Sequence, residues 1–282
     1  ASNNTGLGDS VFAALTTGDN NTAVGSAALV ANTTASENTA VGKGALNANT
    51  TGANNTGLGR AALANNTTAA NNTAVGYFAL VANTTGSENQ AFGTYALTAN
   101  TTASSNTAVG YNSLGAVTTG DGNVALGLRA GETLTTGTNN VLLGQSAGSY
   151  DGNDITTGTN NVLVGNFNKV SAANSSHQLV LGYYVTSTGD NNFTFGNSTT
   201  DSNITFGATS ITAPSDVRLK ENIQDEEVGL DFINDLRPVT FQWKKEKDIP
   251  SDMKAYKKGS ETRTMNGKYN HGFIAQEVKE VI

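Results

Sequence analysis

The sequence predicts a mainly β protein: a trimeric parallel β-solenoid with a 17-residue repeat, followed by a small α+β domain. Two observations lead to this fold class. A short motif, Asn-Thr-x-Val/Leu-Gly, recurs at a fixed spacing through most of the chain. Charge is distributed unevenly, because 12 of the 16 Lys and Arg residues lie in residues 213–282 and four in residues 1–212. The chain therefore divides into a repetitive part and a charged part.

The composition of the 282 residues argues against several classes of protein. The absence of Cys excludes a disulfide framework and a thiol site, and two His residues are too few for a His-built metal site, so we expect no cofactor. A net charge of −7 opposes nucleic-acid binding, which needs a basic patch. No apolar run approaches the roughly 18–20 residues of a membrane span, so we expect no membrane insertion. The chain begins at Ala1 without a visible signal peptide, which favours a fragment or a processed product.

The repeat is defined by the glycine that closes each motif. Eight equal 17-residue steps separate Gly8, Gly25, Gly42, Gly59, Gly76, Gly93, Gly110, Gly127 and Gly144. The period then drifts, first to a longer step and finally to shorter ones, at Gly165, Gly182, Gly196 and Gly207. A fixed period indicates one structural unit stacked on the next, and a unit of this length suits one solenoid coil with two short strands and two turns. We therefore expect regular coils over residues 1–165 and an irregular, tapering neck over residues 166–212.

Alternation within each motif suggests which side chains point inward. In residues 38–42, period-2 alternation places Thr39 and Val41 on one face and Ala40 on the other. Because later copies make the first face more apolar, we expect it to be the inner face. The residues predicted to point inward are Val24, Val41, Val75, Val109, Leu126 and Leu143. A leucine four residues after the glycine is expected to fill the same core from the opposite side, at Leu29, Leu46, Leu63, Leu80, Leu97 and Leu114.

An asparagine also recurs in register, at Asn21, Asn38, Asn55, Asn72 and Asn106. These side chains either form a ligand-binding face or stack their amides along the solenoid axis, and we favour stacking. The core of Ala, Thr and Val is thin and aromatic residues make up only 7% of the chain. Several chains that bury a common face would remedy this, so we expect a cyclic homotrimer. About 13 coils at roughly 4.8 Å each give a rod of about 60 Å.

The repeat resembles the head repeats of trimeric autotransporter adhesins, with their Ser/Asn-x-Ala-Val/Ile-Gly strands, and the shaft repeats of bacteriophage tail fibres. The resemblance covers residues 1–165. It implies a trimeric solenoid and says little about a ligand.

The charged part, residues 213–282, has the pattern of a mixed domain. Helical spacing predicts a helix over residues 228–236, which Arg237-Pro238 ends. Alternation predicts a strand over residues 239–243. A polar and charged, mobile loop over 244–268, a strand over 269–273 and the start of a helix over 274–282 are expected to follow.

Three motifs of this domain carry a second resemblance. They are Ser-Asp-x-Arg-Leu-Lys-x-Asn-Ile at residues 215–223, Leu-Arg-Pro-Val-Thr-Phe-x-Trp at 236–243 and His-Gly-Phe-Ile-Ala-Gln-Glu-Val at 271–278. Together, and in this order, they resemble the intramolecular chaperone domain of endosialidase-type tail fibres; a similar domain occurs in some membrane-tethered transcription factors. The resemblance implies a domain that trimerises the fibre and then cuts itself off.

The same resemblance implies an autocatalytic serine–lysine dyad, with Ser215 as the nucleophile and Lys220 as its base. Attack of the Ser215 hydroxyl on the preceding carbonyl, an N→O acyl shift, would give an ester at Pro214–Ser215 that water hydrolyses. Lysine acts as a base only where its surroundings lower its pKa. Asp216 and Asn222 are candidate supporting residues that orient the pair or stabilise the oxyanion. The alternative is a linker serine and a surface lysine in a relative that does not cleave.

Three functions fit these features. The first is a tail-fibre protein of a virion, or of a related extracellular injection device, that binds a host cell-surface receptor (a glycan or a protein). The second is a trimeric adhesin of the bacterial cell surface with the same chaperone domain. The third is a polysaccharide-degrading tailspike, which we rank last: glycoside hydrolysis needs two carboxylates about 5–10 Å apart, whereas Glu37 and Glu88 stand three repeats apart, at roughly 14 Å.

Overall fold

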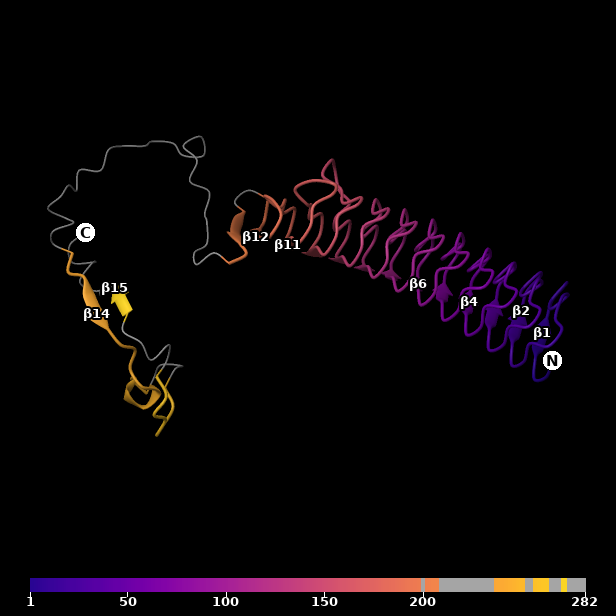
Figure 1. The fold of residues 1–282 in the computed structure, drawn as a ribbon, viewed down its shortest axis with the longest axis horizontal. Coiled ribbons are helices and arrows are strands. Elements are labelled where there is room, and N and C mark those ends of the chain that lie inside the picture. The colour runs from indigo at the N-terminus through magenta and orange to yellow at the C-terminus, as the bar shows by residue number, and fades with distance from the viewer. Residues whose placement is uncertain (199–200, 208–235, 252–255, 264–269, 273–282) are drawn as a thin grey trace. The chain divides into compact units, whose positions relative to one another are not determined.

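The computed structural model describes residues 1–198, 201–207, 236–251, 256–263 and 270–272 (Figure 1). It divides into two compact units, Ala1–Ser215 and Asp216–Ile282.

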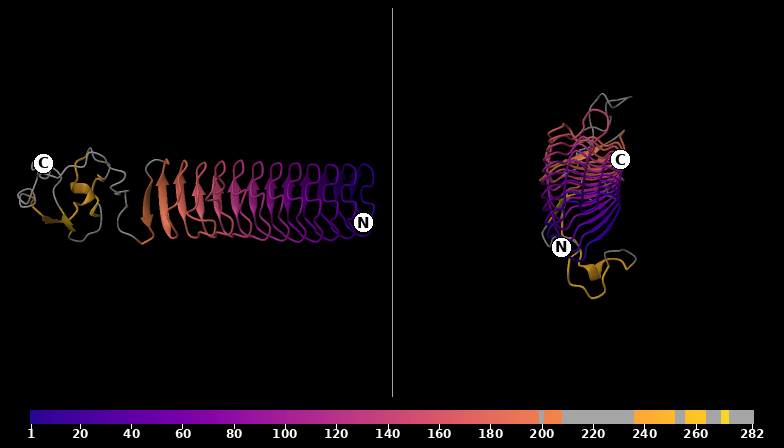
Figure 2. Two further views of the ribbon diagram at one scale, coloured as in Figure 1. Left: turned by 90° about the horizontal axis from the view of Figure 1, so that it is seen from above. Right: turned by 90° about the vertical axis from the view of Figure 1, so that its right-hand side faces the viewer.

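The first unit is a solenoid whose strands form one long sheet in sequence order. The sheet has 13 strands, and the first twelve are paired in parallel, each with the strand of the next coil (Figure 2). The strands are β1 (Thr5–Leu7), β2 (Thr22–Val24), β3 (Thr39–Val41), β4 (Thr56–Leu58), β5 (Thr73–Val75), β6 (Gln90–Phe92), β7 (Thr107–Val109), β8 (Val124–Leu126), β9 (Val141–Leu143), β10 (Val162–Val164), β11 (Leu179–Gly182), β12 (Asn192–Gly196) and β13 (Ser202–Thr205). The predicted parallel β-solenoid is confirmed.

Each coil contains one strand, and the prediction of two strands per coil is wrong. The Ala-Leu segment opposite the strand is a series of turns, in which residues two and four places after the closing glycine have positive φ, as at Ala27 (58°) and Leu29 (48°). A strand cannot include such left-handed residues. The turns still bond from coil to coil, because Leu29 N–H donates to the Ala45 carbonyl at 3.1 Å.

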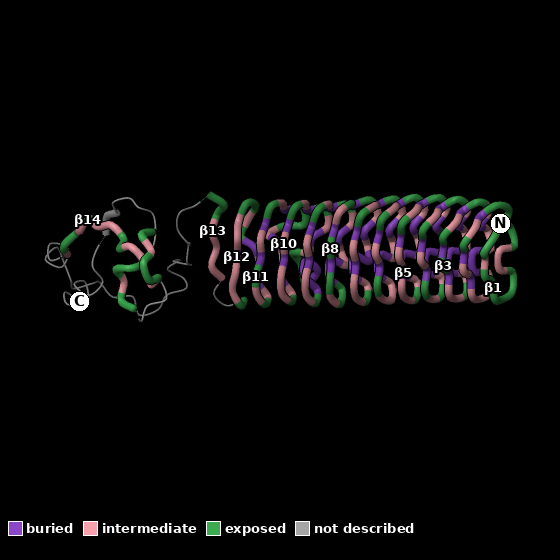
Figure 3. Tube along the Cα trace, turned by 90° about the horizontal axis from the view of Figure 1, so that it is seen from below, coloured by how far each residue is buried: buried purple, intermediate pink, exposed green. Residues whose placement is uncertain are grey.

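The inward and outward faces of the strands are also the reverse of the prediction. The central residue of each strand points inward, so Ala23 and Ala40 are fully buried, whereas Leu126 is 54% exposed. The residues predicted to point inward lie instead on the outer sheet face: Val24, Val41, Val75, Val109, Leu126 and Leu143. The leucines of the opposite turns fill the core as predicted, and Figure 3 shows the buried residues as continuous lines inside the stack.

The reason for this arrangement is the limited width of the coil. A Cβ placed on Gly57, the central residue of β4, would meet the Leu46 Cγ at 3.4 Å, so the leucines leave room for little more than an alanine methyl. Where the strand centre becomes Leu142, the turn position opposite becomes glycine: a Cβ on Gly131 would lie 2.6 Å from the Leu142 Cδ1. The large residue has moved from the turn to the strand, and the small residue has moved from the strand to the turn.

The closing glycine of each motif meets two requirements, and Gly42 illustrates both. Its φ is 134°, a conformation that side chains disfavour, and a Cβ there would lie 2.4 Å from the carbonyl oxygen of Gly59 in the next coil. The glycine column therefore lets successive corners stack in contact.

The parallel stack ends in a reversal. Strand β13 pairs with β12 in the antiparallel direction, with Phe193 opposite Ile204. The last predicted coil, which would close at Gly207, is thus a hairpin, because the short step from Gly196 to Gly207 cannot lead the chain around the core.

In the second unit, β14 (Val239–Phe241) pairs antiparallel with β15 (Asn270–Gly272), near the two strands predicted there. The segment between them contains a 3₁₀ turn, η2 (Glu246–Asp248). Most of the predicted helix over residues 228–236, and all of the one over 274–282, lie outside the described residues.

Candidate functional site

The predicted catalytic residues Ser215, Lys220, Asp216 and Asn222 all lie outside the described residues, so the dyad stays a prediction. The described residues offer three other candidate features: the asparagine rows, the outer sheet face and an edge rich in aromatic side chains.

The asparagine row of the sequence is a buried structural ladder, not a ligand face. Asn38 donates from its backbone N–H (2.9 Å) and its Nδ2 (3.2 Å) to the Oδ1 of Asn21 in the preceding coil. Asn55 N–H donates in turn to Asn38 Oδ1 at 2.9 Å, and all three residues are fully buried. The predicted stacking of amides is therefore confirmed.

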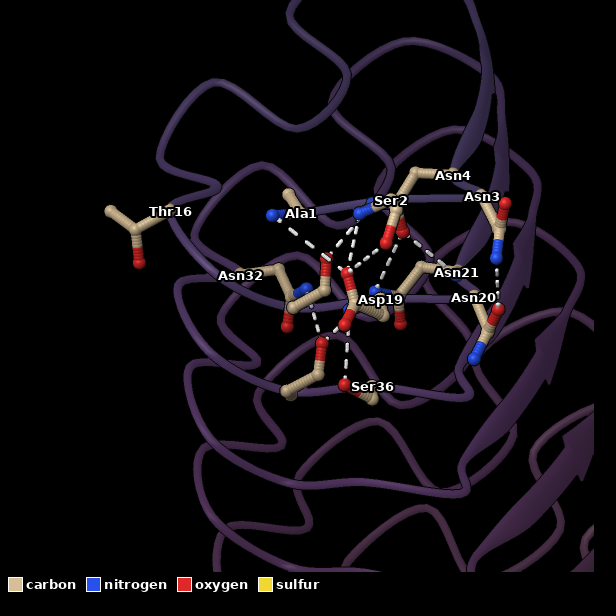
Figure 4. A network of polar contacts seen from close by, with 12 residues as sticks. Ala1, Ser2, Asn3, Asn4, Thr16, Asp19, Asn20, Asn21, Asn32 and Ser36 are labelled. Atoms are coloured by element: carbon tan, nitrogen blue, oxygen red, sulfur yellow. Dashed lines mark hydrogen bonds and ion pairs between the residues drawn. The ribbon is translucent and has the colours of Figure 1, made fainter.

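Figure 4 shows where this ladder begins, at Asn4, whose Oδ1 accepts from Asn21 N–H at 2.8 Å. Beside it, the backbone N–H and the hydroxyl of Ser2 donate to the Asp19 carboxylate. These bonds, the backbone one foremost, lower the pKa of Asp19 below its ordinary value. Polar contacts thus run between coils outside the core as well as within it.

A second ladder lies along the Asn-Thr-Thr turns, at Asn32, Asn49, Asn66, Asn83 and Asn100. In each step the Nδ2 of one residue donates to the Oδ1 of the preceding one, as from Asn66 to Asn49 at 2.8 Å. The ladder stops because the next position holds Val117, and the buried Asn100 Oδ1 consequently has no hydrogen-bond partner. The ladder rather than any ligand explains this asparagine row too.

The outer sheet face carries a continuous apolar row, formed by the last outward-pointing residue of each parallel strand. Its members are Leu7, Val24, Val41, Leu58, Val75, Phe92, Val109, Leu126, Leu143, Val164, Leu181 and Phe195. None is charged, and Leu7 (70% exposed) and Leu126 (54%) are among the most accessible. At about 4.8 Å per coil the row extends for roughly 50 Å. This row of apolar side chains is a candidate interaction surface.

Aromatic side chains gather at the corner that follows the strands, one or two residues after the closing glycine. Tyr77, Tyr95 and Tyr111 stack edge to face with centroid distances of 5.6 and 6.1 Å. The guanidinium of Arg60 lies 5.5 Å from the centre of the Tyr77 ring. This aromatic edge was not predicted from the sequence, although its rings fall one or two residues after the closing glycines and could have been found from that position.

In the second unit, ion pairs join charged residues in and around η2. Lys245 and Lys247 both pair with Glu261, and these bonds lower the pKa of Glu261 from its ordinary value of 4.5 to about 2. Lys257 pairs with Glu246 at 2.8 Å. These charged contacts lie in the segment predicted to be a polar and charged loop.

Among the described residues, no three His, Cys, Asp or Glu side chains come together as metal ligands. In the same part of the chain, no helix has the length and hydropathy to cross a bilayer.

Comparison with known proteins gives one match. Residues 215–282 match the family model described as the chaperone of endosialidase. No curated protein and no solved structure matches the chain. A β-solenoid followed by this domain fits a tail-fibre-like protein with a C-terminal chaperone, and the chaperone family implies trimer formation.

Proposed function

Starting from the chaperone-of-endosialidase match of residues 215–282, we propose that this protein is the trimeric, receptor-binding fibre of a phage tail or a related injection device. Residues 1–207 form its shaft. Residues 215–282 bring three chains into register and then separate from the shaft by self-cleavage at Pro214–Ser215.

The observation that best supports a trimer is the apolar row on the outer sheet face. It leaves Leu126, Leu181 and Leu7 between 46% and 70% exposed in the single chain. Burying apolar area is worth roughly 25 cal/mol per Å², so three chains that cover this row gain stability that one chain lacks. Parallel pairing over a long, uniform repeat is slow and prone to register errors, which gives a C-terminal trimerisation domain a clear purpose.

A charge placed in the apolar row tests the trimer. Leu126→Asp adds a carboxylate that is solvated in a single chain and desolvated between chains, so it should dissociate the trimer without unfolding the coils. Thr119→Asp, on an exposed turn, is the matched control and should leave the trimer intact. Sedimentation velocity and circular dichroism report the two properties separately. If Leu126→Asp remains trimeric, the row is not the interface.

Self-cleavage is tested by intact mass. The Ser215 hydroxyl attacks the Pro214 carbonyl carbon, the C–N bond breaks, and Lys220 passes the hydroxyl proton to the departing amine. Water then hydrolyses the ester, which frees a fragment beginning at Ser215. Ser215→Ala and Lys220→Ala should each leave an uncut chain that still forms trimers. A fragment that begins at any other residue would refute the acyl shift, because this reaction breaks only the bond before its own nucleophile.

A further inference from the structure

One coil of the regular repeat contains an insertion. The step from Gly144 to Gly165 is longer than the regular 17-residue step, and the extra length forms a loop over residues 149–154 that projects from the stack (Figure 1). The coil closes beneath the loop: Ile155 is fully buried and donates its N–H to the Gly148 carbonyl at 2.8 Å. The core does not need the loop, and insertions in one repeat are commonly binding loops.

Aromatic contacts hold this loop in place. The Tyr150 ring lies 4.7 Å from Phe167 and 5.1 Å from Tyr184, and the Tyr184 hydroxyl donates to that of Tyr150 at 2.9 Å. The Lys169 Nζ lies 5.6 Å from the centre of the Tyr150 ring and donates to the Asp151 carbonyl at 3.1 Å. The insertion is thus organised before any ligand arrives, which lowers the entropic cost of binding.

Between this loop and the aromatic edge lies a cavity of about 570 Å³. Tyr111 and Phe167 of the aromatic edge and Tyr150 of the insertion line it. The volume lies within the range of about 300–1,000 Å³ that is common for small-molecule sites. Tyr111 is 44% exposed, so its ring is accessible in the single chain.

The charged groups around the cavity carry no surplus of positive charge. Arg129 lies 3.6 Å from Glu132, which also accepts from Asn112 Nδ2 at 2.6 Å. Lys169 and two further carboxylates, Asp151 and Asp154, lie close by, and burial raises the pKa of Asp154. An anionic ligand would find no positive surplus to neutralise it, so the site favours a neutral ligand with many hydroxyl groups.

We propose that this cavity binds a neutral oligosaccharide, a proposal that rests on the receptor-binding function above. The electron-rich faces of Tyr111 and Tyr150 suit the C–H faces of pyranose rings. Gln145, Glu132 and Arg129 supply donors and acceptors for sugar hydroxyls.

The test uses the full 282-residue chain on a printed array of neutral hexose and N-acetylhexosamine oligosaccharides, with sialylated and uronate oligosaccharides as charged comparators. We expect binding to neutral members, with affinity then measured by calorimetry on the strongest. Tyr111→Ala and Tyr150→Ala should each weaken it about tenfold. Deleting residues 150–153 restores the regular step and should abolish binding. Tyr77→Ala, on the same edge but outside the cavity, is the control and should bind within about twofold of wild type.

Sedimentation velocity on the same samples separates this proposal from the trimer proposal. If the chain is a monomer and binds neutral glycans, the glycan-binding proposal stands and the trimeric-fibre proposal is refuted. If the chain is a trimer and binds none of the neutral glycans, the glycan-binding proposal is refuted. Preference for the charged comparators, unchanged binding in Tyr111→Ala, or loss of the trimer in Tyr111→Ala would each overturn it as well, the last by showing that the cavity lies between chains.

Discussion

Replacing one asparagine of the second ladder provides a quantitative test of how the solenoid is held together. Asn66 is fully buried; its Nδ2 donates to Asn49 Oδ1 at 2.8 Å and to the Ala69 carbonyl at 3.0 Å. Its Oδ1 accepts from Asn83 Nδ2 at 2.8 Å. Asn66→Ala removes these bonds and leaves Asn49 Oδ1 buried without its donor.

The magnitude follows from which groups lose a partner. An unsatisfied buried acceptor costs about 1–3 kcal/mol, and loss of the remaining bonds and of packing adds about 1–2 kcal/mol. Asn83 retains its bond to the Gly86 carbonyl at 2.9 Å, so it adds little. We therefore expect Asn66→Ala to lower the free energy of unfolding by about 2–5 kcal/mol per chain.

Two matched variants sharpen this test. Asn65→Ala changes the adjacent, exposed asparagine and should alter stability by less than about 0.5 kcal/mol. Asn100→Ala removes the end of the ladder, where Oδ1 already lacks a partner, and merely transfers that deficit to Asn83. It should therefore cost about 1–3 kcal/mol less than Asn66→Ala.

Guanidinium unfolding gives the global stabilities, and amide hydrogen exchange shows whether the loss is concentrated in the coils on either side of residue 66. Equal unfolding midpoints for Asn66→Ala and Asn65→Ala would refute the claim that the ladder stabilises the stack.

Three further predictions concern the corners, the core and the second unit. Gly42→Ala should prevent stacking of adjacent corners and lower the melting temperature by several degrees, because its Cβ would lie 2.4 Å from the Gly59 oxygen; Ala48→Gly is the control for a general loss of stability. Leu142→Asp should unfold the coils where Leu126→Asp only separates chains, since Leu142 is fully buried; similar circular dichroism for both would contradict the assigned faces. The depressed pKa of Glu261 means that its pairing stabilises the fold above pH 4.5 and is lost as the pH falls towards 2; an NMR titration of Glu261 with a midpoint near 4.5 would show that the pairs do not form in solution.

The repeat could be predicted from the sequence because a fixed 17-residue step permits little other than one coil per step. The direction of the strand side chains could not, since alternation in Thr39-Ala40-Val41 gives two faces without saying which is inner. Hydrophobicity favoured the valine as the inward-pointing residue. Leu46 and its equivalents already occupy the core, however, and leave room only for alanine. The volume opposite the strand, not the polarity of the strand, decides the face.

The cavity at the surface could not be predicted from the sequence either. The longer step from Gly144 to Gly165 was visible in the sequence as a drift of the period, yet the cavity beside it depends on Tyr111 and Tyr150, which lie more than two repeats apart in the sequence. Only the stacking of coils brings these side chains to one edge. The asparagine ladder, by contrast, follows directly from the register, because identical residues at the same position of successive coils must lie one above another.

The most direct test of the fibre is the molar mass of the folded chain in solution. Sedimentation equilibrium at micromolar concentration, with Ser215→Ala to keep the chain intact, should give three times the chain mass of 28.9 kDa. A folded species at 28.9 kDa would contradict the trimer. It would show that the chain folds stably with the apolar row exposed to water.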